Sequence, residues 1–150
     1  MLEYGQKKLS AQEKDFVLSV AADARALPLP DASVDGVTMA FGIRNIAPRS
    51  ASFAEMARVL KPGGRACILE FGTGKNRIWL GVYNFYLKRI LPLIGRLSGD
   101  ADAYRYLAKT IMEFPDAEAL ANEMRATGFG RIYHIPLCSG IVFLHVAEKR

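Results

Sequence analysis

Residues 23–45, DARALPLPDASVDGVTMAFGIRN, decide the fold class of this chain. They run from an acidic residue through a loop with two prolines into VDGVTMAF (34–41), an apolar stretch with the length of a buried strand. Proline removes a backbone donor and restricts the residue before it, so the loop interrupts regular structure. A polar pair, Arg44 and Asn45, follows the strand. This order of acidic loop, strand and polar turn is typical of one wall of a nucleotide-type cofactor pocket.

The rest of the chain alternates apolar strand-like runs with segments of helical periodicity. The sequence predicts strands at 16–22, 34–41, 65–71, 131–137 and 140–148, and helices at 2–13, 50–60, 77–97, 102–112 and 116–128. The short turn CSG joins the last two strands into an antiparallel hairpin. This order predicts an α/β, Rossmann-like sheet with an antiparallel edge, whose ligands bind beyond the carboxyl ends of its strands.

The composition is that of one globular domain. The chain has 150 residues, 51% of them hydrophobic, which suffices for a buried core and excludes a disordered chain. Its net charge of +5 is spread without a dense basic run, so we expect no nucleic-acid partner. Cys67 and Cys138 lie far apart in apolar runs, without metal-ligand spacing, and indicate buried free thiols in a reducing compartment. With no signal segment and no uncharged apolar span of about 20 residues, we expect a cytoplasmic protein, soluble or peripheral to a membrane.

Residues at two predicted strand ends are candidates for a cofactor pocket. Asp23 follows the first strand, where its carboxylate could accept a hydrogen bond from an adenine amino group, and the small Ala24 lets a ring approach the backbone. The alternative is that Asp23 only caps the next turn. Ala40 and Phe41 end the second strand, where a small residue suits a passing ring or ribose, but both could equally belong to the core.

Arg44 and Glu70 are the candidates for chemistry. A flexible turn delivers Arg44 and Asn45 to the edge of the sheet where ligands bind, although a solvated arginine is also common at such a place. Glu70 lies inside the apolar run RACILEF (65–71). Because a buried carboxylate is seldom left unpaired, we expect Glu70 to meet a cation, a donor or a ligand.

Four longer stretches carry a family resemblance. They are ADARALPLPDASVDGVTMAFGIRNI, RVLKPGGRACILEF, DADAYRYLAKTIMEFPDAEALANEMRATGF and the closing GIVFLH. Parts of the first two recur across many S-adenosylmethionine-dependent methyltransferases, whereas FGIRN joined to DADAYRYLAKTIMEFP is much more specific. From about Met1 to its C-terminus, the chain resembles the ubiquinone/menaquinone biosynthesis C-methyltransferases, the UbiE family.

This resemblance implies a class I methyltransferase fold and transfer of a methyl group from S-adenosyl-L-methionine to a ring carbon of a polyprenylated quinol. By the same resemblance, Asp23 and Ala24 match adenine-side positions, and Ala40 matches a cofactor-contacting position where relatives often carry serine. Arg44 falls on the arginine of the family's FGxRN motif and is expected to face the substrate as the catalytic residue. The further expected substrate contacts are Phe41, Asn45, Tyr83 and Tyr104.

The chemistry favours Arg44 as a donor. A quinol carbon becomes nucleophilic when a ring hydroxyl loses its proton, so negative charge develops on oxygen. Arginine does not deprotonate in proteins and is a poor base. We therefore expect Arg44 to stabilise the phenolate, with or without a bridging water. The apolar and basic insert at about 77–112 fits either a lid packed on the core or a lipid-facing tunnel for a greasy substrate.

The chain departs from the family before its first residue. Relatives carry two further βα units there, one with the glycine-rich turn D/E-x-G-x-G-x-G and one ending in the acidic residue for the ribose. We therefore expect residues 1–150 to be a single, incomplete methyltransferase domain, truncated at its N-terminus, in which residues 16–22 lack a strand to pair with.

Several interpretations of the function remain open. The chain is a quinone-pathway methyltransferase with a truncated sequence, an inactive remnant acting as a partner subunit in quinone biosynthesis, or a homodimer or split enzyme that completes its sheet in trans. Another small-molecule or phospholipid methyltransferase with the same cofactor motifs is the runner-up among enzymes, since the substrate rests on resemblance alone.

Overall fold

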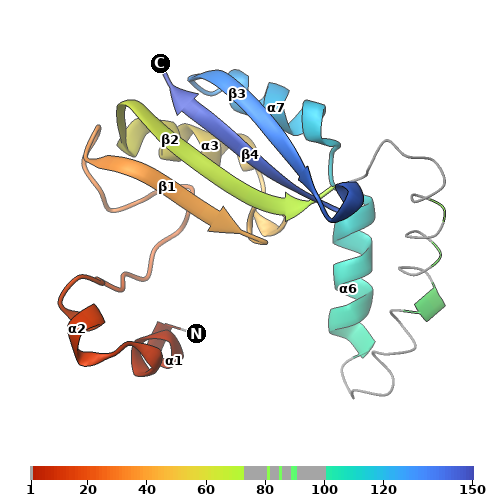
Figure 1. The fold of residues 1–150 in the computed structure, drawn as a ribbon, viewed down its shortest axis with the longest axis horizontal. Helices are drawn as coiled ribbons and strands as arrows, with labels where there is room; N and C mark the ends of the chain where they lie inside the picture. The colour runs from red at the N-terminus through yellow and green to blue at the C-terminus, as the bar shows by residue number, and fades with distance from the viewer. Residues whose placement is uncertain (1, 73–80, 82–84, 86–88, 91–100) are drawn as a thin grey trace.

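A four-stranded sheet forms the centre of the chain in a computed structural model, which describes residues 2–72, 81, 85, 89–90 and 101–150 (Figure 1). The strand order is β1-β2-β4-β3. β1 (Val34–Ala40) and β2 (Leu60–Phe71) are parallel, whereas β4 (Val142–Lys149) pairs antiparallel with β2 and with β3 (Phe129–Leu137). The predicted α/β sheet with an antiparallel edge is confirmed.

The helices of the folded body follow the predicted order. They are η1 (Ile43–Asn45), α3 (Arg49–Val59), α6 (Ala101–Met112), α7 (Ala117–Arg125) and η3 (Cys138–Gly140). The Asp116 carboxylate caps α7 by accepting a hydrogen bond from the Ala119 backbone N–H at 2.8 Å, which satisfies a donor that the helix start leaves open. Most of the helix predicted at 77–97 lies outside the described residues.

β2 starts at Leu60, earlier than the predicted start at Arg65. The helix α3 does end before KPGGR, as predicted, but these residues form the first part of β2 and not a turn outside the sheet. Val34 of β1 pairs with Leu60 and Gly36 pairs with Arg65, so the register shifts between these pairs. Gly63 adopts a φ of +77°, which a residue without a side chain accepts at no steric cost. The turn residues therefore form a bulge within the β1–β2 pairing.

The core lies between the sheet and two helices. Figure 1 shows α3 and α7 on the same side of the sheet. Phe53 and Met56 of α3 meet Leu120 and Met124 of α7 in one buried cluster, and Ile68 contributes from β2. The helical spacing of these apolar side chains explains why α3 and α7 present one face each to the sheet.

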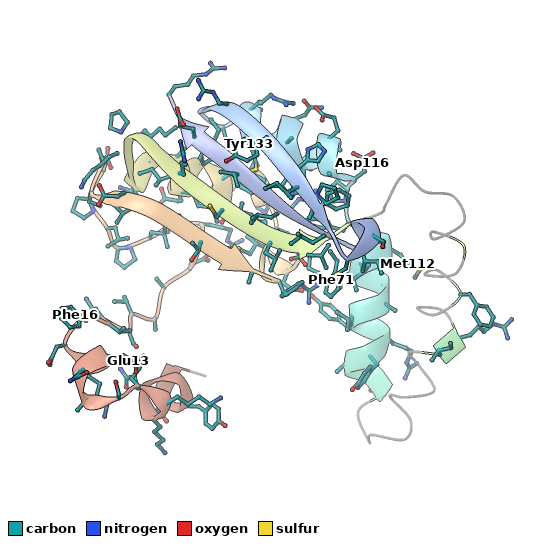
Figure 2. All side chains as sticks on the ribbon, viewed as in Figure 1. Glu13, Phe16, Phe71, Met112, Asp116 and Tyr133 are labelled. Atoms are coloured by element: carbon teal, nitrogen blue, oxygen red, sulfur yellow. The ribbon has the colours of Figure 1, made fainter. Side chains whose placement is uncertain are left out.

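The opposite side of the sheet carries apolar side chains that remain accessible. On β3 these are Tyr133, Ile135 and Leu137, whose exposed fractions are 47%, 42% and 40%. Tyr133 is labelled on the sheet in Figure 2. Their cross-strand partners on β4 are Val146, which is buried, and the partly exposed Leu144 and Val142. We call the five accessible residues, Tyr133, Ile135, Leu137, Leu144 and Val142, the open sheet face. A contiguous apolar face of this kind marks an interaction surface or an aggregation hazard.

The strand predicted at 16–22 is wrong. Phe16 and Leu18 are 89% and 88% exposed, and the segment forms no strand. Before it, the structure has two short helices, α1 (Leu2–Lys8) and α2 (Ala11–Lys14), in place of the single helix predicted at 2–13. Ser10 separates them, because its side chain and that of Glu13 form a capping box that starts α2. An apolar run becomes a strand only where a neighbouring strand accepts its backbone hydrogen bonds.

Candidate functional site

The turn after β1 is the first part of the site. Phe41 follows the strand with a φ of +53°, a left-handed conformation that is uncommon for a bulky side chain and is often kept at functional sites. Its backbone N–H donates to the Leu69 carbonyl at 2.8 Å, which ties the turn to β2. Ile43, at the start of η1, is fully buried and anchors the turn on the core. The turn therefore holds Arg44 and Asn45 at the carboxyl ends of two parallel strands.

Arg44 forms a buried ion pair with Glu70. Nη1 of Arg44 donates to Oε1 of Glu70 at 2.8 Å, and the exposed fractions of the two side chains are 11% and 0%. The same Nη1 donates to the Phe41 carbonyl at 2.6 Å. The expectation that Glu70 meets a cation is confirmed, whereas the alternative of a solvated Arg44 is wrong. The buried carboxylate draws the guanidinium inward, because a charge left unpaired in the interior is costly.

An aromatic pair lies beside the guanidinium of Arg44. Its Cζ lies 5.5 Å from the centroid of the Phe71 ring, within the range of a cation–π contact. The Phe71 ring in turn lies 4.8 Å, centroid to centroid, from the ring of Phe41. The Nε of Arg44 is buried and has no hydrogen-bond partner. A buried donor without a partner is rare in folded proteins, so this N–H is a candidate for binding an acceptor.

The helix α6 lies against η1 at this site. The Tyr106 hydroxyl donates to Oδ1 of Asn45 at 2.9 Å, which joins the helix to η1. Tyr104 and Phe71 pack against the buried Ala108 and Ile111 cluster of α6, and Figure 2 shows Phe71 close to this end of the helix. The structure thus brings Asn45 and Tyr104 to the same edge as Arg44.

Tyr106 was missed by the sequence reasoning, although it lies two residues after Tyr104 in the motif that carries the resemblance. No local signal could have found it, because side chains two positions apart on a helix do not face the same contact and Asn45 lies 61 positions away. Tyr83, the remaining substrate candidate, lies outside the described residues.

The loop that contains Asp23 lies near the turn that follows η1. Arg25 connects the two, since its Nη1 donates to the Ala47 carbonyl at 2.7 Å. The Asp23 carboxylate accepts from the Arg25 backbone N–H at 2.8 Å and from Arg25 Nη2 at 2.7 Å. These hydrogen bonds lower the pKa of Asp23 to about 2. Asp23 therefore does cap its own turn, as the alternative interpretation held, and it remains half-exposed and ionised.

The cysteines and histidines lie apart from the turn after β1. Cys67 is partly buried and Cys138 is exposed at the turn between β3 and β4, so the prediction that both thiols are buried is wrong. Nε2 of the buried His145 makes a 3.0 Å hydrogen bond with the Ala117 carbonyl, and burial lowers the pKa of this imidazole. Its ring lies 5.7 Å from that of His134 on the neighbouring strand.

No group of three metal-ligating side chains occurs within residues 2–72 and 101–150. In the same described ranges, no helix has the length and apolarity to span a bilayer.

Comparison with curated proteins links the chain to quinone biosynthesis enzymes. It is 46% identical over 151 residues to "Ubiquinone/menaquinone biosynthesis C-methyltransferase UbiE" of Marinomonas sp. (strain MWYL1), with 99% of this chain and 60% of that protein covered. The protein of the same name from Geobacter sulfurreducens is 45% identical over 128 residues, with 85% and 50% covered. This chain therefore spans between half and about two thirds of the length of such relatives.

Solved structures agree on the fold. A SAM-dependent methyltransferase from Thermotoga maritima, described as a possible histamine N-methyltransferase, superposes with a TM-score of 0.62 at 18% identity, with 92% of this chain and 67% of that chain covered. A SAM-dependent methyltransferase from Aquifex aeolicus gives a TM-score of 0.62 at 15% identity, with 99% and 63% covered. The fold is that of class I methyltransferases. Since the model of the ubiE/COQ5 methyltransferase family matches residues 1–149, the chain belongs to that family.

Proposed function

We propose that this chain acts in the S-adenosylmethionine-dependent methylation of a ring carbon of a polyprenyl quinol in ubiquinone or menaquinone biosynthesis. The observation that carries the proposal is Arg44, held at the carboxyl end of β1 with a buried, unpartnered Nε. The names of the relatives, at 40–46% identity, supply the reaction and the pathway.

The described residues fit the adenine side of the cofactor. Asp23 is ionised and half-exposed, so its carboxylate has acceptor sites for an amino group beyond those that Arg25 uses. Ala24 is small, and Ala40 is exposed at the carboxyl end of β1. When bound, S-adenosylmethionine would supply a methyl group on a sulfonium. We assign Asp23, Ala24 and Ala40 to its adenine and ribose side.

In this proposal, Arg44 stabilises the negative charge that develops on a ring oxygen of the quinol. An arginine donor in a site closed to water acts more strongly than one in solvent, because the surrounding dielectric is low. The Arg44 side chain is 11% exposed, its guanidinium lies over the Phe71 ring, and Phe41 packs on Phe71. Asn45 is oriented by the Tyr106 hydroxyl, and with Phe41, Tyr83 and Tyr104 it is assigned to the ring and the start of the prenyl chain.

A second candidate function is that of a noncatalytic partner subunit or homodimer in quinone biosynthesis. The open sheet face and the exposed segment around Phe16 and Leu18 favour it, because a solitary chain gains by covering such apolar surface. A lipid surface is the remaining candidate contact for this apolar material.

The test compares Arg44→Lys with a matched Arg49→Lys, since Arg49 also pairs with a carboxylate but lies away from the turn. Lysine keeps the charge but lacks the planar fork of donors. We expect Arg44→Lys to lower kcat for a short-chain demethylated quinol by roughly 100-fold, while calorimetry gives an unchanged affinity for S-adenosylmethionine. Equal losses of affinity and turnover would assign Arg44 to structure. Wild-type protein that neither binds the cofactor nor turns over, but associates in light scattering, would favour the partner subunit.

A further inference from the structure

Glu70 is fixed in one orientation by three donors. Its Oε1 accepts from Arg44 Nη1 at 2.8 Å and from the Phe71 backbone N–H at 3.0 Å, and its Oε2 accepts from the Arg44 backbone N–H at 3.3 Å. Two of these donors belong to the backbone, so they do not depend on the guanidinium. The side chain is fully buried in β2, and a rotation toward solvent would break all three hydrogen bonds.

The Glu70 carboxylate and the Phe41 carbonyl both accept hydrogen bonds from the same nitrogen of the Arg44 guanidinium, Nη1. An arginine has five N–H donors in a plane, two of them on Nη1. The side-chain hydrogen bonds of Arg44 to the described residues both start from Nη1, one to Glu70 and one to Phe41. The buried Nε has no partner. Nε and Nη2 together form the fork that binds an oxyanion with two parallel hydrogen bonds.

We infer that Glu70 is the positioning residue of this site: together with the Phe41 carbonyl it holds Nη1 of Arg44, so that the Nε and Nη2 fork is presented to a phenolate oxygen. This inference rests on the proposed function, because it names the residue that orients the proposed catalytic arginine. Glu70 does not touch the substrate in this arrangement and acts only through Arg44. Phe41 contributes to this positioning, because its left-handed backbone conformation orients the carbonyl that accepts the second hydrogen bond from Nη1.

Glu70→Gln tests the inference with little change of shape. Glutamine has one acceptor oxygen where glutamate has two, so it cannot serve both Nη1 and the Arg44 backbone N–H, and it carries no charge. The matched control is Glu123→Gln, which alters the half-exposed pair between Arg49 and Glu123. We expect Glu70→Gln to lower kcat by roughly 100-fold without a matching change in KM, because a misplaced donor costs transition-state stabilisation and not substrate binding. Glu123→Gln keeps the wild-type kcat.

A second measurement does not depend on turnover. The ¹⁵N–¹H resonance of Arg44 Nε–H, identified by its absence in Arg44→Lys, is followed while 4-nitrophenol is added to the full chain above the pKa of that phenol. We expect the resonance to shift in the wild type and in Glu123→Gln, with phenolate affinity roughly ten- to a hundredfold weaker in Glu70→Gln. Glu70→Asp, whose carboxylate is one methylene shorter, takes the place of Glu70→Gln if far-UV circular dichroism shows that the latter is unfolded.

The outcomes separate the two proposals. A wild type that transfers no methyl group contradicts the proposed function, and the 4-nitrophenol titration then decides the inference alone. A wild-type Nε–H that does not respond to the phenolate overturns the inference, as does equal phenolate affinity in wild type and Glu70→Gln. A kcat of Glu70→Gln equal to that of an active wild type overturns it as well.

Discussion

The ion pair between Arg44 and Glu70 predicts an asymmetric double-mutant cycle. Glu70→Ala leaves the guanidinium of Arg44 buried without its carboxylate and leaves the Phe71 backbone N–H without an acceptor. Breaking a buried pair in this way costs about 3–5 kcal/mol of unfolding free energy. Arg44→Ala is milder, because Glu70 keeps both backbone donors and loses one charge-assisted hydrogen bond, a cost of about 1.5–3 kcal/mol.

The double variant then shows the coupling. Once Glu70 is absent, removing Arg44 also removes the unpaired buried charge, so the second substitution adds little cost. We therefore expect the double variant to lose about 1.5–3 kcal/mol less than the sum of the two single losses, which is the upper part of the range for residues in direct contact.

Urea unfolding followed by far-UV circular dichroism measures all four proteins at one protein concentration, with equal m-values required for the comparison. The control cycle uses Arg49 and Glu123, whose side chains are 28% and 33% exposed. A pair that open to solvent contributes about 0–1 kcal/mol. Single losses at Arg44 and Glu70 that add up in the double variant would refute the coupling. A larger loss from Arg44→Ala than from Glu70→Ala would refute the role given to the backbone donors.

Two further predictions concern acid stability and the open sheet face. Hydrogen bonds from Arg58 and the Leu27 backbone N–H lower the pKa of Glu55 from 4.5 to about 2, so the stability that Glu55 contributes is complete above pH 4.5 and is lost as the pH falls toward 2. Glu55→Gln should reduce this loss of stability when urea midpoints are compared at pH 7, 4 and 2.5. An unchanged pH profile in the variant would contradict the prediction. Ile135→Lys places a charge on the open sheet face and should reduce self-association in light scattering more than Ala126→Lys does, since Ala126 is an exposed residue at the C-cap of α7. Equal effects of the two substitutions would show that this face is not the contact.

Elements with local signals were predictable from the sequence. Apolar residues at helical spacing predicted α3 and α7, and the run VDGVTMAF predicted β1. The segment 16–22 has an equally good local pattern, but a strand also needs a partner, and pairing is not encoded within the run itself. The bulge at KPGG is the opposite case, because pairing with β1 extends β2 through residues whose local preference is a turn.

The residue types of the candidate site were predictable from the sequence, whereas the contacts between those residues were not. A glutamate inside an apolar strand required a partner, and the turn after β1 placed an arginine at the same edge of the sheet. Their pairing could not be derived from the pattern, since Arg44 and Glu70 are 26 positions apart and the contact depends on the register of β1 with β2. The link between Tyr106 and Asn45, 61 positions apart, escaped for the same reason.

Arg58 and Arg44 differ in how many of their side-chain donors have acceptors. Arg58 donates from Nε, Nη1 and Nη2 to Glu55, to Asp31 and to two backbone carbonyls, so all five of its N–H bonds are used in holding the proline loop. Arg44 uses only Nη1 of its side-chain donors on described residues, and its Nε is buried without a partner. A buried ion pair is seldom more stable than apolar side chains of similar volume, so stability alone is a weak reason for placing one here. The proposed function accounts for an arginine that is held at Nη1 and has no partner at Nε, because the negative charge that it would bind is present only during the reaction.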